Sequence, residues 1–74
     1  MSQEIAQARL IRSLAVLNDS LHVTVMRAGQ AHDMAEVVSE ELADVLGSIH
    51  YKLYASWRIL DELLAEQQYP PAAP

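Results

Sequence analysis

A chain of 74 residues forms one domain at most, and a domain of that size buries little apolar surface without a disulfide, a metal or a partner subunit. Cysteine is absent, which excludes disulfide and thiolate chemistry. Ten acidic residues against five basic ones give a net charge of -5, which repels nucleic-acid phosphates and anionic lipid. We therefore expect no nucleic-acid partner and no membrane.

The first part of the chain predicts an amphipathic helix over residues 3–29. Ser2 is a candidate N-cap, and Gly29 is expected to end the helix. Between them leucines recur at spacings of three and four, which is typical of one apolar helix face. These leucines are Leu10, Leu14, Leu17 and Leu21.

A capping box, Asp33-Met34-Ala35-Glu36, predicts the start of a second helix over residues 34–67. A wide apolar stripe follows the capping box at helical spacing, and it includes Leu42, Ile49, Leu53, Trp57 and Leu60. Residues Tyr69-Pro70-Pro71 cannot continue a helix, so residues 69–74 are expected to form a disordered Pro-rich tail.

Two segments of low helix propensity, Asn18-Asp19-Ser20 and Gly47-Ser48, lie inside the predicted helices. Each could break its helix. The apolar pattern keeps its phase through both segments, which favours continuous helices. No apolar stretch approaches the roughly 20 residues that span a bilayer, and the first residues lack the basic segment of a signal peptide, so we expect a cytoplasmic protein.

These elements predict an all-α fold, an antiparallel two-helix hairpin that forms one domain over residues 1–68. A lone hairpin is too slender to cover its own apolar stripes, so we expect a homodimer packed as a four-helix bundle. Residues assigned to the oligomer core are Leu10, Leu14, Leu17, Leu21, Leu42, Ile49, Leu53, Trp57 and Leu60.

A surface for a protein partner is predicted on the outer faces of both helices. Tyrosine and arginine are common at binding hot spots, and Tyr51, Tyr54 and Arg58 lie close together in the second helix. Apolar residues opposite the leucine stripe of the first helix add Ile5, Val16 and Val23 to this set. The same residues could instead be oligomer contacts.

Acidic residues near the start of the second helix are candidate metal ligands: Glu36, Glu40, Glu41 and Asp44. Pairs three or four residues apart share one helix side and could chelate Mg2+, whereas in the simpler interpretation they form a solvated face. His32, next to Asp33, could likewise form a weak metal site with Asp33 and Glu36, or be an exposed turn residue.

The segment Glu40-Glu41-Leu42-Ala43-Asp44 resembles the EExxD segment of the all-helical MazG-like nucleotide pyrophosphatases. The resemblance implies magnesium ligands at Glu40, Glu41 and Asp44 that face a second acidic ExxE pair on an earlier helix. The earlier helix here offers only Glu4 and Asp19 and no ExxE pair.

The sequence as a whole favours a non-enzymatic module for protein–protein interaction, an adaptor, regulator, inhibitor or chaperone-like subunit. No serine lies in a GxSxG elbow, and two glycines cannot build a phosphate-binding loop, so we expect neither catalysis nor a cofactor. Two alternatives stay open: a metal-dependent pyrophosphatase of the MazG-like type, and a purely structural self-assembling subunit.

Overall fold

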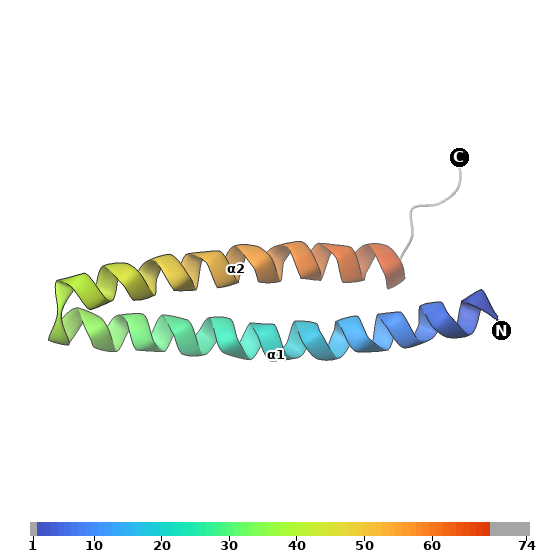
Figure 1. The fold of residues 1–74 in the computed structure, drawn as a ribbon, viewed down its shortest axis with the longest axis horizontal. Coiled ribbons are helices and arrows are strands. Elements are labelled where there is room, and N and C mark those ends of the chain that lie inside the picture. Colours follow the sequence, from blue (N-terminus) through green and yellow to red (C-terminus); the bar gives the residue numbers. More distant parts are fainter. Residues whose placement is uncertain (1, 69–74) are drawn as a thin grey trace.

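The computed structural model describes residues 2–68 as two long antiparallel helices joined by a tight turn (Figure 1). Helix α1 spans Gln3–Val38 and helix α2 spans Glu40–Gln68. The predicted all-α hairpin is thus confirmed. The predicted tail over residues 69–74 lies outside the described residues.

The start and the continuity of the helices agree with the sequence. Ser2 caps α1, because its hydroxyl accepts a hydrogen bond from the Glu4 backbone N–H at 3.1 Å. Neither helix is broken at the segments of low propensity, since α1 runs through Asn18–Ser20 and α2 runs through Gly47 and Ser48.

The turn lies at Ser39, so the predicted boundaries at residues 29 and 34 are wrong. Ser39 has an extended backbone, with φ -161° and ψ 127°, and its N–H donates to the Ala35 carbonyl at 2.8 Å. Its hydroxyl accepts a hydrogen bond from the Leu42 N–H at 3.4 Å. One serine therefore ends α1 and caps α2, with Glu40 and Glu41 in the first turn of α2.

Gly29 and the predicted capping box lie inside α1 instead of marking a helix end and a helix start. No described glycine has a positive φ. The His50 ring lies so close to Gly29 that a Cβ there would be 3.2 Å from its Nε2. Asp33 and Glu36 flank His32 of the same helix, with carboxylate oxygens 3.7 Å and 3.3 Å from its ring nitrogens. The close approach of the helices thus explains Gly29, and contacts within α1 explain Asp33 and Glu36.

The glycine and histidine contacts are reciprocal. Gly29 precedes His32 by one helical turn in α1, and Gly47 precedes His50 by the same interval in α2. A Cβ on Gly47 would lie 3.2 Å from Nε2 of His32, just as a Cβ on Gly29 would meet His50. Each glycine thus makes room for the imidazole of the other helix.

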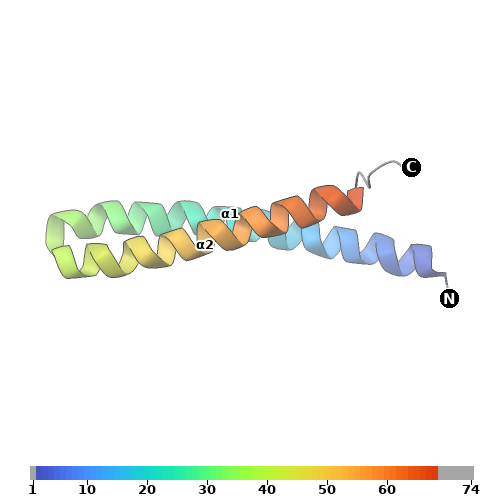
Figure 2. The same ribbon diagram turned by 90° about the horizontal axis from the view of Figure 1, so that it is seen from above.

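The remaining cross-helix contacts share this register. Asn18 contacts Asp61, and the His22 ring stacks on Trp57. Residues that lie further toward the C-terminus of α1 therefore contact residues that lie equally further toward the N-terminus of α2. Figure 2 shows the two helices crossing at a shallow angle.

The seam between the helices has the alternating three- and four-residue spacing of a coiled coil. In α1 the buried and half-buried seam residues are Ile11, Leu14, Asn18, Leu21, Val25, Ala28, His32 and Ala35. In α2 they are Ala43, Leu46, His50, Leu53, Trp57, Leu60, Leu64 and Gln67.

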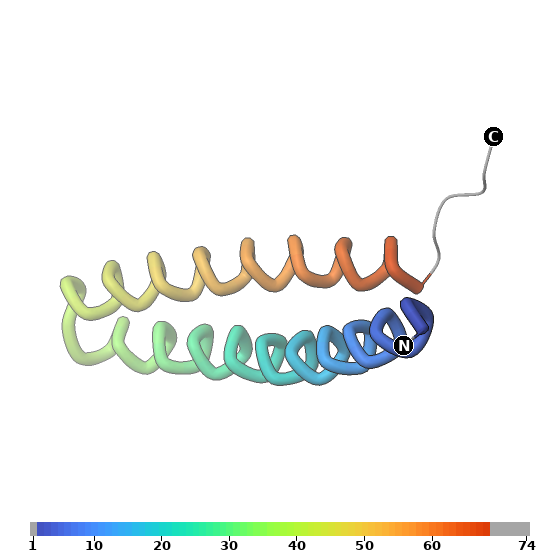
Figure 3. Tube along the Cα trace, turned by 45° about the vertical axis from the view of Figure 1, so that its right-hand side comes forward, coloured from blue at the N-terminus to red at the C-terminus, as the bar shows by residue number. Residues whose placement is uncertain are grey.

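The hairpin is a single layer of two helices, as Figures 1 and 3 show. Its extents are 54 × 27 × 13 Å, so its thickness is about that of one helix. The chain exposes 5952 Å2, against about 4500 Å2 expected for a compact monomer of its mass. Of the described side chains none is fully buried.

The glycine–histidine contact predicts an altered response to a helix-favouring substitution. Alanine inside a helix normally stabilises by about 1 kcal/mol over glycine. We expect Gly29→Ala to give this gain in a His50→Ala background and clearly less in the natural chain, because the imidazole must move. Urea unfolding followed by circular dichroism measures both effects. Ser48→Ala is the matched control with equal effects in the two backgrounds, and equal effects of Gly29→Ala would contradict the contact.

Candidate interaction surfaces

One side of the seam is flanked by residues without charge, which we call the uncharged face. Its large aliphatic side chains are about half exposed, with Leu10 at 51%, Leu17 at 53% and Leu42 at 51%. In an antiparallel pair of helices, the residues that come directly before every second seam residue lie on the same side of the seam in both helices. Here the seam residues in question are every second one from Ile11 in α1 and every second one from Ala43 in α2. They are Leu10, Leu17, Thr24, Ala31 and Val38 of α1 and Leu42, Ile49, Ser56 and Leu63 of α2.

Exposed apolar residues also border the uncharged face. Met34 lies next to it on α1, and Val45 and Ile59 lie next to it on α2; all three are exposed. The charged residues beside this face are few, with Arg27 and Lys52 near its middle and Glu66 at its open end. Contiguous exposed apolar surface is common at protein–protein interaction sites, which makes this face a candidate.

The opposite side of the seam, which we call the polar face, carries aromatic and charged residues. The His22 ring stacks on Trp57 with 4.8 Å between ring centroids, and Tyr54 lies 5.9 Å from the same indole. Asp61 receives a hydrogen bond from the Asn18 amide on this side at 3.3 Å.

Three predicted partner-binding residues lie together on this polar face. Tyr51 is 72% exposed, and Tyr54 is exposed one turn along α2. The Tyr54 hydroxyl accepts a hydrogen bond from Arg58 Nη1 at 3.4 Å. This bond raises the pKa of Arg58, and the Glu62 carboxylate, 3.9 Å from Nη2, acts in the same direction. The guanidinium is thus a permanent positive charge beside the tyrosine rings.

The other predicted partner-binding residues are not brought to that patch. Val16 and Val23 are exposed on the side of α1 that faces away from α2. Ile5 is exposed near the start of α1, at the open end of the hairpin. The predicted set therefore divides into a tyrosine patch on α2 and separate apolar positions on α1.

The predicted oligomer core also divides in two. Leu14, Leu21, Leu53, Trp57 and Leu60 lie in the seam of the hairpin itself. Leu10, Leu17, Leu42 and Ile49 lie on the uncharged face. Spacings of three and four fit both the seam and the uncharged face, so all four leucines of α1 fall in one predicted stripe. For the same reason Leu63, which lies on the uncharged face, is absent from the predicted set.

The seam also contains a polar residue that sequence analysis missed. Asn18 is buried at a position that would ordinarily be aliphatic. Its Oδ1 accepts a hydrogen bond from Trp57 Nε1 at 3.4 Å, and its Nδ2 donates to Asp61 at 3.3 Å. A polar seam residue with partners at one alignment only favours that alignment over shifted ones.

Only some of the candidate metal ligands lie close to one another. Within residues 2–68, the group whose potential ligand atoms come within 4.8 Å of one another is His32, Asp33 and Glu36. Glu40, Glu41 and Asp44 do not join this group. The two carboxylates face different nitrogens of the His32 ring and are largely exposed, which fits an ion-pair arrangement better than one shared cation.

The net charge is concentrated at the turn end of the hairpin. Between Gly29 and Tyr51 five residues are acidic and none is Lys or Arg. The five acidic residues are Asp33, Glu36, Glu40, Glu41 and Asp44. All five basic residues and the other five acidic residues lie outside this stretch, so their charges cancel. The turn end thus carries the whole formal charge of -5.

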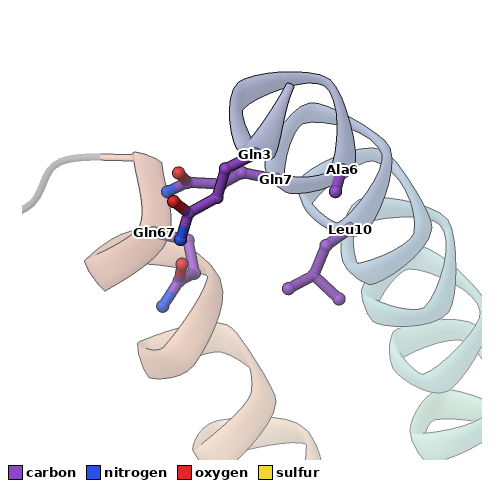
Figure 4. Close-up of a pocket in the computed structure, with 5 residues that line it drawn as sticks. All are labelled: Gln3, Ala6, Gln7, Leu10 and Gln67. Carbon is purple, nitrogen blue, oxygen red and sulfur yellow. The ribbon is translucent and has the colours of Figure 1, made fainter. Parts of the chain in front are cut away.

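A shallow hollow of about 420 Å3 lies at the open end of the hairpin (Figure 4). It is lined by Gln3, Ala6, Gln7, Leu10 and Gln67. In Figure 4 the side chains of Gln3 and Gln7 reach from α1 toward Gln67 of α2. The lining residues offer amides and apolar carbon but no titratable or nucleophilic group, so the hollow is equipped for contact and not for acid–base catalysis.

Comparisons with protein-family models, with curated proteins and with solved structures find no match to this chain. Over residues 2–68, neither helix combines the length and the apolar character that crossing a membrane requires. The geometry of the surfaces therefore carries the functional argument.

The buried asparagine predicts a trade between stability and alignment. We expect Asn18→Leu to raise the free energy of unfolding by about 1 kcal/mol, because an aliphatic side chain fills the seam. Asn18→Ala is the control, and it should lower stability through the lost packing and the unpaired Trp57 N–H. Urea unfolding followed by circular dichroism measures both variants. A loss in Asn18→Leu as large as that in Asn18→Ala would contradict this account.

Proposed function

We propose that this chain is a non-enzymatic protein–protein interaction module that forms a homodimer and presents helix surfaces to a client protein. The single-layer shape supports the proposal, because two helices alone leave large aliphatic side chains half exposed. Full burial of one such side chain contributes about 1.5–3 kcal/mol, so covering the exposed halves of several would contribute a few kcal/mol.

The tyrosine patch supports the client part of the proposal. Tyr51 and Tyr54 offer amphipathic rings beside the fixed positive charge of Arg58. Residues of these types carry much of the binding energy in many interfaces. We propose that a client packs on this patch by helix-on-helix contact, with apolar anchors giving affinity and charges giving orientation.

The chemistry of the described surfaces supports a role without catalysis, such as that of a cytoplasmic adaptor, regulator, inhibitor or chaperone-like subunit. The hollow at the open end has no acid, base or nucleophile. The acidic residues that resemble part of a MazG-like site do not converge on one point.

Light scattering on the purified chain tests the self-association. We expect a solution mass of two chains of 8.2 kDa each. A dimer without any client would favour the purely structural subunit, whereas a monomer would contradict self-association and leave binding of a different protein as the way to cover the apolar residues.

Substitutions at the tyrosine patch and on α1 test the client surface. We expect Tyr51→Ala to weaken capture of a client from native host extract about 30-fold or more, as truncation of a hot-spot residue does. Val23 lies apart from the tyrosine patch, so Val23→Asp is a separate test of the apolar positions on α1; it should abolish capture of a client that contacts this side, because it places a charge in an apolar contact. Circular dichroism should show unchanged helicity. Ser48→Ala, on the exposed side of α2, is the matched control, and unaltered capture by both test variants would remove the proposed surfaces.

Divalent cations test the alternative of a metal-dependent pyrophosphatase. We expect Mg2+ and Mn2+ to leave the Tm of the chain unchanged, because within residues 2–68 the carboxylates of Glu40, Glu41 and Asp44 do not gather into a metal-binding group. Thermal unfolding with and without millimolar cation measures this. A clear rise in Tm that Glu41→Gln removes would instead support a metal site and contradict the non-enzymatic proposal.

A further inference from the structure

We propose that the second copy docks on the uncharged face in the antiparallel sense, with the acidic turn end of each chain beside the open end of the other. The inference rests on the proposed self-association and adds the face, the orientation and the alignment of the two copies.

The choice of face follows from the cost of burying charge. The nine residues of the uncharged face include no ionisable group. The polar face carries Glu36, Glu40 and Asp61 directly beside the seam. Packing two copies through the polar face would remove these carboxylates from water, which is costly, whereas packing through the uncharged face covers only apolar surface and hydroxyls.

The orientation follows from the position of the charge. A parallel dimer would place the five turn-end carboxylates of one chain beside the same five of the other. An antiparallel dimer separates these two groups by most of the 54 Å length of the hairpin. Each turn end then meets the open end of the partner copy, which carries Arg9 and Arg12 among its acidic residues and is therefore less acidic than a second turn end.

The alignment follows from the order of large and small residues along the face. Thr24 and Ser56 lie at the same level near its middle. A two-fold axis at this level places Leu17 of one copy on the small Ala31 of the other, and it places Leu63 on Ile49 as an aliphatic pair.

The same axis places Leu10 on the pair formed by Val38 and Leu42. At the axis itself the Thr24 hydroxyl already donates to the Ser20 carbonyl at 2.9 Å, so its burial leaves no unpaired donor. The face is therefore complementary to itself in one antiparallel alignment, as a two-fold interface requires.

Single introduced cysteines test the orientation, because the chain has none and each new thiol can pair only with its own copy. We expect Ser56→Cys to form a disulfide-linked dimer under mild oxidation, seen on a non-reducing gel, since this residue lies at the proposed axis. Leu42→Cys alone should stay unlinked, because the two copies of this residue lie at opposite ends. Mixing Leu42→Cys with Leu10→Cys should give the mixed disulfide.

Charge substitutions test the face in the same chain. Ile49→Glu should weaken self-association about a hundredfold or more in light scattering, because it buries an unpaired carboxylate. Met26→Glu, on the other side of α1, is the matched control and should leave the dimer intact. Circular dichroism of both variants should show an unchanged hairpin.

The outcomes separate this inference from the proposed function. A dimer that persists in Ile49→Glu, or one in which Leu42→Cys links to itself as readily as Ser56→Cys, would overturn the antiparallel docking while self-association stands. A natural chain that is monomeric would overturn both.

Discussion

Two helices in one layer can bury only the residues that face each other, and this constraint governs the rest of the structure. The seam of α1 and α2 includes small and polar residues, among them Ala43, Asn18 and His32. Of its large aliphatic residues only Val25 and Leu60 are buried, and the others are half-buried. Much of the apolar surface of the described residues therefore lies exposed beside the seam.

The seam specifies alignment more than it contributes stability. Gly29 and Gly47 admit the imidazoles of His50 and His32, and Asn18 finds its partners only when it lies opposite Trp57 and Asp61. A shift of one helical turn would set an imidazole against a larger side chain and leave the Asn18 amide without these bonds. The alignment in turn decides which flanking residues share a face.

The hairpin could be predicted from the sequence because its apolar residues keep helical spacing over both halves. The position of the turn could not, because Gly29 and the Asp33–Glu36 box have the local pattern of a helix end and a helix start. In the structure both lie inside α1, where Gly29 admits the His50 ring of α2 and Glu36 contacts His32 of the same helix. The pattern that does mark the start of α2 is Ser39 followed by Glu40 and Glu41. This pattern is as short as the Asp33–Glu36 box, so the sequence does not distinguish the two.

The surfaces were harder to predict than the fold, because a helix places neighbouring rows of residues only a small rotation apart. Leu14 and Leu17 belong to the same sequence stripe, yet one lies in the seam and the other on the uncharged face. Once the seam is known, the charged residues are seen to lie mainly on the polar face. The net negative charge is concentrated at the turn end. In the proposed dimer the second copy covers one side and leaves the tyrosine patch of the other side accessible. Self-association and client binding are therefore proposed for separate surfaces of the same hairpin.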